Sequence, residues 1–172
     1  NEALKRSRGE YIAFIDHDDI WLSEKLEKQV LLFRNPKVGL VYCDDIIFDM
    51  SGRTMNKSKH IKYCTGSCFA KLFTDYFLDL STVIIRRSVL DNMEIWFEPN
   101  FKIVEDGDLF FRVAYKWELD MVNEPLAKWR VHSASLTWSN KHLAIEERAI
   151  ILEKFYRIYP DFANKFKREI CI

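Results

Sequence analysis

The sequence contains few of the residues that mark the simplest protein classes. Its 172 residues include only 5 Gly, 4 Pro and 4 Cys, a composition that excludes a collagen-like, low-complexity or disulfide-dense protein. Lys and Arg together number 26 and Asp and Glu together number 26, so the formal net charge is 0. A nucleic-acid-binding protein would carry a basic face. We therefore expect no nucleic-acid partner.

Long apolar runs are also missing. A membrane-spanning helix needs ~20 apolar residues, whereas the apolar run at residues 11–15 is among the longest in this chain. The first ten residues are polar and charged, so no signal peptide is recognisable. Position 1 is Asn rather than Met, and we expect the sequence to start within a longer protein.

The cysteines allow two interpretations. Cys64 and Cys68 form a C-x3-C spacing with His60 upstream, and Cys43 is the obvious candidate for a fourth zinc ligand. The simpler interpretation, which we favour, is that they are reduced and mostly buried thiols.

The residues that are abundant predict a folded α/β domain. Hydrophobic residues make up 48% of the chain and aromatic residues 15%, enough to form a real core at this length. Apolar periodicity predicts short strands alternating with helices in the first part and a mixed order later, which indicates α/β with some α+β character. The expected strands are 11–15, 38–42 with 46–48, 82–85, 119–122 and 126–131; the expected helices are 1–8, 23–34, 69–77, 88–93, 105–117 and 142–159.

Two of these elements and one loop carry further expectations. The run 11–15 reads as a buried strand inside a parallel sheet. The helix 23–34 is expected to be capped by Ser23 or Asp19. Its periodicity predicts one buried face formed by Leu22, Leu26, Val30 and Phe33. Residues 53–65 are polar and patternless, and we expect a loop there.

An acidic cluster directly follows the first strand. Asp16 and Asp18 point to the same side of an extended backbone, and two carboxylates on one side can hold Mg²⁺ or Mn²⁺. Ligands of open α/β sheets bind beyond the carboxyl ends of the strands. The alternative is a solvated acidic turn in which Asp19 caps the next helix. His17, between the two aspartates, is expected to point away from the metal, because alternation sends it to the other side.

Residues 7–29 resemble the central segment of family 2 glycosyltransferases of the GT-A fold, whose pattern is A-x-G-E-Y-I-x-F-L-D-x-D-D followed by a helix. The resemblance continues in the family's order with 41–52, with 82–87, with an E-D-x-D-L-x-x-R segment at 104–112 and with an R-x-H-x-x-S segment at 129–135. It implies an α/β, Rossmann-like mixed sheet flanked by helices and incomplete at the N-terminus. Residues 1–138 would form the C-terminal part of a GT-A glycosyltransferase domain, and 139–172 a C-terminal helical extension.

The resemblance also implies roles for individual residues. Asp16 and Asp18 would be the DXD pair that contacts the metal, the diphosphate and the ribose, with Asp18 as the direct ligand of Mg²⁺ or Mn²⁺. Asp106 would be the catalytic base, with Glu105 as its rival. Arg130 and His132 would bind the donor diphosphate, and His132 is a further candidate metal ligand.

The implied activity is metal-assisted transfer of a sugar, with inversion, from a nucleotide-diphosphate-sugar donor to a hydroxyl of a glycan or lipid-linked glycan acceptor. Bacterial-type cell-surface polysaccharide biosynthesis is the expected setting, in the cytoplasm or peripherally at the inner face of the membrane. A Q-x-x-R-W segment is missing from the sequence, which favours transfer of single sugars. The absent N-terminal units would leave an exposed sheet edge open to self-association, and the fragment alone would be weak or inactive. Two alternatives stay open: a metal-dependent nucleotidyltransferase, and a non-catalytic fragment acting as a binding module.

Overall fold

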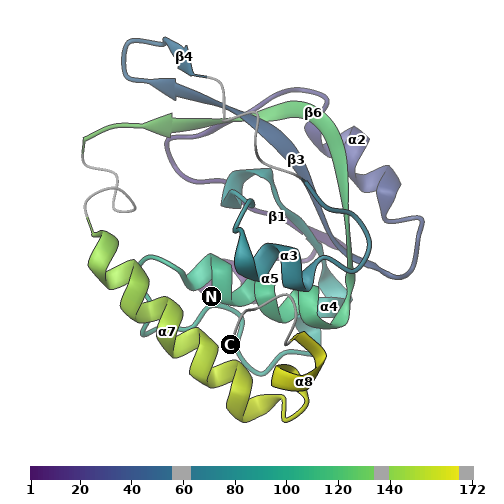
Figure 1. Ribbon diagram of the computed structural model, residues 1–172. Coiled ribbons are helices and arrows are strands. Elements are labelled where there is room, and N and C mark those ends of the chain that lie inside the picture. Colours follow the sequence, from purple (N-terminus) through teal and green to yellow (C-terminus); the bar gives the residue numbers. More distant parts are fainter. Residues whose placement is uncertain (56–62, 134–139, 167–172) are drawn as a thin grey trace.

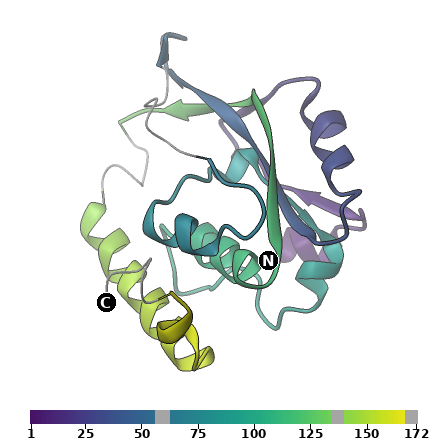
Figure 2. The same cartoon turned by 45° about the vertical axis from the view of Figure 1, so that its right-hand side comes forward.

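The structure is a computed structural model that describes residues 1–55, 63–133 and 140–166. These residues form a six-stranded mixed sheet with helices on both faces (Figures 1 and 2). The predicted α/β fold class is therefore confirmed.

The sheet is built around two long strands. Its members are β1 (Tyr11–Ala13), β2 (Ile20–Trp21), β3 (Val38–Asp49), β4 (Thr54–Met55), β5 (Ile84–Arg86) and β6 (Glu118–Val131). The order is β1-β5-β3-β6-β2, with β4 paired to β3, and among these pairs β3 and β6 run parallel while the others run antiparallel. The expectation that 11–15 lies inside a parallel sheet is therefore wrong. Strand β1 stops at Ala13, is an edge strand of the sheet and pairs antiparallel with β5. Self-association through this edge stays a prediction.

The helices follow the sequence pattern closely. They are α1 (Glu2–Arg6), α2 (Lys25–Leu32), α3 (Phe69–Thr74), the 3-10 turn η1 (Leu80–Thr82), α4 (Arg87–Asp91), α5 (Glu105–Lys116), α7 (Lys141–Ile158) and α8 (Phe162–Phe166). The helix expected to reach residue 77 ends at Thr74, because Phe77 and Leu78 leave the helix to enter the core. Part of the loop expected at 53–65 is the strand β4, and residues 56–62 lie outside the described residues.

The long strands replace pairs of shorter ones that the sequence predicted. Residues 119–122 and 126–131 belong to one strand, β6, although Pro125 lies between them. A proline is tolerated in a strand where the ladder is irregular, and the register of β3 and β6 shifts on both sides of the pair Asp44 and Pro125. Gly39 in β3 permits a close approach, since a Cβ there would lie 2.6 Å from the Cβ of Trp117.

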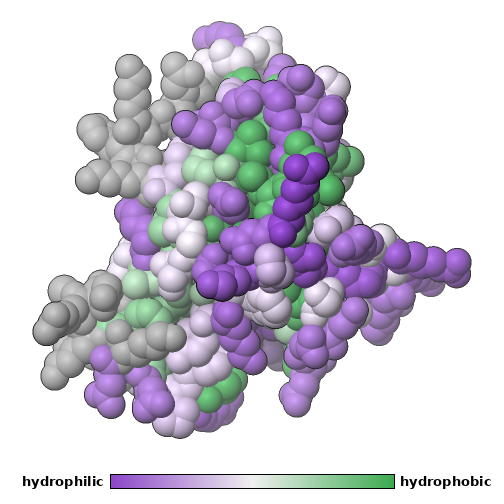
Figure 3. Space-filling view, turned by 90° about the vertical axis from the view of Figure 1, so that its right-hand side faces the viewer, coloured by the Kyte–Doolittle hydropathy of each residue, from purple (hydrophilic) through white to green (hydrophobic). Residues whose placement is uncertain are grey.

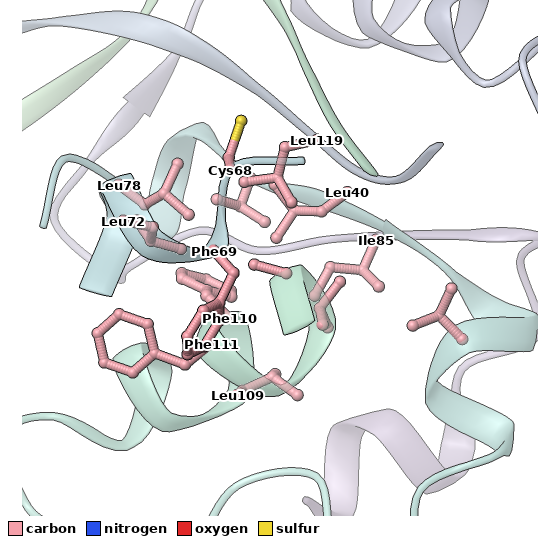
Figure 4. Packing of buried hydrophobic residues seen from close by; sticks show 14 of the residues in the cluster. Leu40, Cys68, Phe69, Leu72, Leu78, Ile85, Leu109, Phe110, Phe111 and Leu119 are labelled. Carbon is pink, nitrogen blue, oxygen red and sulfur yellow. The ribbon is translucent and has the colours of Figure 1, made fainter. Parts of the chain in front are cut away.

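Side chains of β3 alternate between two hydrophobic layers. Leu40 and Tyr42 face the larger cluster, which lies under α3, α5 and α7; Figure 4 shows part of this packing. Val41 faces a smaller cluster with Phe33, at the end of α2. Because both faces of β3 are covered, residues Val38 to Cys43 are buried without interruption.

The buried face predicted for α2 is confirmed at Phe33 and wrong at Leu26 and Val30. Leu26 and Val30 are 45% and 37% exposed, whereas Lys25 and Gln29 are fully buried. Gln29 belongs under the sheet because its side-chain N–H donates to the carbonyls of Thr82 (2.8 Å) and Val41 (3.3 Å). The side of the molecule that carries α2 consequently shows hydrophobic surface (Figure 3).

The helix cap predicted for this region is also wrong. The N-cap position of α2 is Glu24, with no side-chain capping bond, so neither Ser23 nor Asp19 caps the helix.

The C-terminal helices pack into the same core as the rest of the chain. Ile151 and Phe155 of α7 and Phe162 of α8 belong to the larger hydrophobic cluster. The domain boundary expected at 138/139 lies outside the described residues. Within the described part of the chain, the structure has no helix long and apolar enough to cross a membrane.

Candidate active site

The acidic loop after β1 is held in place by two distant segments. The Ser81 hydroxyl donates to Asp19 Oδ2 (2.5 Å) and accepts from the Asp16 backbone N–H (3.0 Å). The backbone N–H of Arg130 donates to Asp19 Oδ1 (2.9 Å). Asp19 is therefore the aspartate that ties the loop to the rest of the fold, which leaves Asp16 and Asp18 as the members that can meet a ligand.

Asp18 lies next to two residues that were predicted to bind the donor diphosphate. They are Arg130, in β6, and His132, just after it. The His132 Nε2 and Asp18 Oδ2 atoms are 3.2 Å apart, and the Arg130 Nε–H donates to the Asp18 carbonyl (2.9 Å). The Arg130 guanidinium also lies 4.3 Å from the centre of the Phe48 ring, a cation–π contact. His17 is 94% exposed, with its Nδ1 3.8 Å from Asp18 Oδ1.

Side chains suited to a divalent metal form no large cluster in the described part of the chain. No group of three or more His, Cys, Asp or Glu in residues 1–55, 63–133 and 140–166 could hold a metal. Asp18 and His132 form a pair of one carboxylate and one imidazole, a donor set that suits Mn²⁺ when further ligands come from elsewhere. Cys43 and Cys68 are buried free thiols, and His60 lies outside the described residues.

The Glu105–Asp106 pair opens α5. The Tyr76 hydroxyl donates to Asp106 Oδ2 (3.1 Å), and the Gly107 backbone N–H donates to Asp106 Oδ1 (2.6 Å). Burial raises the pKa of Asp106 to about 6, and the charge of Glu105 adds to the effect. Such a carboxylate is still mostly ionised at neutral pH, yet it is a stronger base than an ordinary aspartate.

Glu105 and Asp108 have different surroundings. Glu105 Oε2 is buried and has no hydrogen-bond partner among the described residues. Asp108 is fully buried and pairs with Arg112 (2.8 Å) and with Lys154 of α7 (2.9 Å). Asp108 therefore joins α5 to α7 and takes no part in the acidic site.

A second contact from α7 anchors the start of α5. The Glu147 carboxylate is buried and accepts three backbone N–H groups, from Lys102 (2.8 Å), Ile103 (3.0 Å) and Val104 (3.1 Å). The last of these N–H groups lies two residues before Asp106, so α7 sets the position of Asp106 through Glu147.

Asp16 and Asp106 open onto one cavity of about 300 Å³. Burial raises the pKa of Asp16, and the charges of Asp19 and Asp18 raise it further. The cavity is lined by Asp16, Tyr76, Phe77, Leu78, Asp79, Leu80, Ile103, Val104, Asp106, Gly107, Phe111, Trp129, Ala144 and Arg148. The fold thus brings two acidic segments, 90 residues apart in sequence, to the same hollow.

Sequence reasoning missed several residues of this site. Ser81, Tyr76 and Glu147 reach their partners across 62, 30 and 43 to 45 residues. None of the three belongs to a recognisable sequence motif, because each acts through a contact made only in the folded chain. The predicted residues Asp18, Arg130 and His132 do come together.

Comparison with known proteins finds a matching family model and several related proteins. The family model described as Glycosyl transferase family 2 matches residues 1–93. An uncharacterized glycosyltransferase of Methanocaldococcus jannaschii is 26% identical over 133 residues, which cover 76% of this chain and 45% of that protein. The Escherichia coli protein WfaP, a UDP-Glc:alpha-D-GlcNAc-diphosphoundecaprenol beta-1,3-glucosyltransferase, is 27% identical over 162 residues, covering 89% of this chain and 58% of WfaP. The chain spans about half the length of these relatives.

Solved structures share the fold. S. aureus TarS superposes with a TM-score of 0.60 at 19% identity, covering 99% of this chain and 32% of TarS. A shorter form of TarS, residues 1–349 in complex with UDP-GlcNAc, gives a TM-score of 0.57 at 18% identity, covering 97% of this chain and 53% of that one.

Proposed function

Because the chain belongs to glycosyl transferase family 2, we propose that it forms the acceptor side and part of the donor side of an enzyme that transfers a sugar from a nucleotide-diphosphate-sugar to a hydroxyl group. The observation that carries this proposal is the shared cavity, into which Asp16 and Asp106 both open. Transfer requires a donor diphosphate and an acceptor hydroxyl to meet. In this proposal Asp16 contacts the donor and Asp106 contacts the acceptor hydroxyl.

Asp106 is proposed as the general base. Its two oxygens each accept one hydrogen bond, from Tyr76 and Gly107, and a carboxylate has lone pairs left for a third partner. An acceptor hydroxyl in the cavity can donate to it and pass its proton to Asp106 as the oxygen attacks the anomeric carbon. The bond between that carbon and the donor diphosphate then breaks, and the diphosphate leaves with the electron pair. A single displacement of this kind inverts the anomeric configuration. Glu105 would raise the basicity of Asp106 through its charge.

Asp18, His132 and Arg130 are proposed to bind the donor diphosphate, with Mg²⁺ or Mn²⁺ held by Asp18 and His132. A divalent ion would neutralise the charge that develops on the leaving diphosphate. Asp16, two residues before Asp18, lines the cavity, where it is proposed to contact the same donor.

The relatives suggest a setting. WfaP is named for a reaction of UDP-Glc with a GlcNAc-diphosphoundecaprenol acceptor, and TarS has been solved with UDP-GlcNAc. We extend to this chain a nucleotide-sugar donor, a glycan or lipid-linked glycan acceptor, and a role in cell-surface polysaccharide biosynthesis at the cytoplasmic side of the membrane.

Calorimetry on the naturally expressed protein tests the proposal. Mn²⁺ with UDP, GDP or dTDP is titrated into the wild type and into Asp18→Ala, Asp106→Asn and the control Asp91→Asn, an exposed carboxylate outside the cavity lining. We expect metal-dependent nucleotide binding that Asp18→Ala abolishes and that Asp106→Asn and Asp91→Asn retain. Sugar transfer should be lost in Asp106→Asn and retained in Asp91→Asn.

The outcomes separate the competing functions. Absence of nucleotide binding by the wild-type protein would refute the proposal. Nucleotide binding with no sugar transfer to any acceptor would favour the binding module, and release of inorganic diphosphate from a nucleoside triphosphate would favour a nucleotidyltransferase.

A further inference from the structure

The wall of the cavity formed by α7 carries a cation. Ala144 and Arg148 lie one helical turn apart on α7, and both line the cavity that holds Asp106. Arg148 is the one Lys or Arg among the described lining residues. Burial, Asp106 and Asp79 raise the pKa of Tyr76, and the Arg148 guanidinium opposes them with a smaller effect.

Arg148 is not used to hold the fold together. Across residues 1–55, 63–133 and 140–166 it makes no hydrogen bond or ion pair. Two of the carboxylates that line the cavity have other partners: Asp79 Oδ1 accepts from the Ser81 N–H (3.0 Å), and Asp106 accepts from Tyr76 and Gly107. The positive charge of Arg148 is thus available to a ligand.

The helix that presents Arg148 is firmly attached. Its neighbour Glu147 is buried against the three N–H groups before α5, and Lys154 pairs with the buried Asp108. The base of the Arg148 side chain therefore has a fixed place relative to Asp106, which lowers the entropic cost of using it to orient a ligand.

Most of the remaining lining is apolar or aromatic. Phe77, Leu78, Ile103 and Phe111 would contact a sugar ring or an alkyl chain but carry no side-chain donor for an anion. An anionic ligand in a cavity that also holds Asp16 and Asp106 would be repelled unless a cation met it. Arg148 is placed to do so, and guanidinium pairs with phosphate and carboxylate through two parallel hydrogen bonds.

We propose that Arg148 is a specificity-determining residue that binds an anionic group of the acceptor, a phosphate or a carboxylate, while the acceptor hydroxyl faces Asp106. This inference rests on the proposed transfer function, because only a transferase has an acceptor. The predicted preference for an anion is a property of binding and is measurable without turnover.

Binding of matched soluble probes to the naturally expressed protein, saturated with UDP and Mn²⁺, tests the proposal. The phosphate probe is an N-acetylglucosaminyl diphosphate ester of a short alkyl alcohol, compared with the uncharged N-acetylglucosaminide of the same alcohol. The carboxylate probe is the alkyl glucuronide, compared with the uncharged alkyl glucoside. We expect at least one charged probe to bind about tenfold more tightly than its uncharged counterpart, and which one does so identifies the anion.

Variants of α7 assign the preference to Arg148. Arg148→Gln should remove the tenfold preference without weakening the uncharged probes, and Arg148→Lys should keep part of it. The matched control is Arg157→Gln, an exposed arginine of the same helix that does not line the cavity, and it should bind like the wild type.

Three results would overturn the inference: a wild type that binds neither charged probe better than its uncharged counterpart, an Arg148→Gln variant that keeps the preference, or one that loses charged and uncharged probes equally. Failure of sugar transfer with the charge preference intact would refute the proposed function and leave the anion site standing.

Discussion

The Glu147 carboxylate on α7 accepts a hydrogen bond from the backbone N–H of Val104, 3.1 Å away, two residues before Asp106. The same carboxylate takes the N–H groups of Lys102 and Ile103. It therefore does for α5 what a capping side chain does, although it comes from a helix more than 40 residues further along the chain.

Glu147→Ala should lower both stability and transfer. It leaves three N–H groups without their acceptor at a buried site, which costs about 2–4 kcal/mol by analogy with lost caps and unpaired buried polar groups. Urea denaturation measures the loss. Glu146→Ala changes the neighbouring exposed carboxylate and should stay within about 0.5 kcal/mol of the wild type; an equal loss in both variants would contradict the capping role.

The pH dependence of transfer should report Asp106. A general base works when it is deprotonated, so kcat/KM should rise with pH and level off above the raised pKa of about 6. Tyr76→Phe removes a hydrogen bond that lowers this pKa, and should move the rise to higher pH. Glu105→Gln removes a negative charge that raises it, and should move the rise to lower pH. Shifts in the same direction for the two variants would contradict the assignment of Asp106 as the base.

The pair Lys154–Asp108 should matter far more to stability than the pair Lys71–Asp75. Asp108 is fully buried, whereas Lys71 and Asp75 are 35% and 54% exposed. Lys154→Met leaves a buried carboxylate with Arg112 as its remaining described partner, and we expect a loss of about 2–3 kcal/mol. Lys71→Met should cost about 0.5 kcal/mol or less. Thermal and urea unfolding of the two variants make the comparison, and equal losses would show that α5 and α7 do not depend on this buried pair.

Lys25 should destabilise the fold at neutral pH. It is fully buried over the Trp21 ring, 4.6 Å from the ring centre, and burial lowers its pKa to about 8. Between pH 8 and about 10 the unfolded chain holds the lysine proton while the folded chain releases it, so the free energy of unfolding contributed by this group rises with pH. Lys25→Met should raise Tm at pH 7, by an amount that shrinks as the pH approaches 10. A variant less stable than the wild type at pH 7 would contradict the prediction.

Local sequence patterns predicted much of the fold. The strand before the acidic loop, the amphipathic α5 and the long α7 were all predicted, because apolar spacing within one element is visible without knowing its neighbours. The same reasoning was right about Phe33 at the end of α2 and wrong about Leu26 and Val30. Its apolar row, Leu26 and Val30, competes with the row of Lys25 and Gln29, and carbonyls of β3 and η1 that accept from Gln29 decide the outcome.

The chemistry of the acidic segments was determined by the sequence alone, since carboxylates at Asp16, Asp18, Asp19, Glu105 and Asp106 are present whatever the fold. Tertiary structure decided which of them share a cavity, which one is used to hold the loop, and which has a raised pKa. Ser81, Tyr76 and Glu147 contribute to these outcomes through hydrogen bonds to partners 30 or more residues away in the sequence. Burial and hydrogen bonding depend on which residues are close in space, so they cannot be predicted from the spacing of residues along the chain.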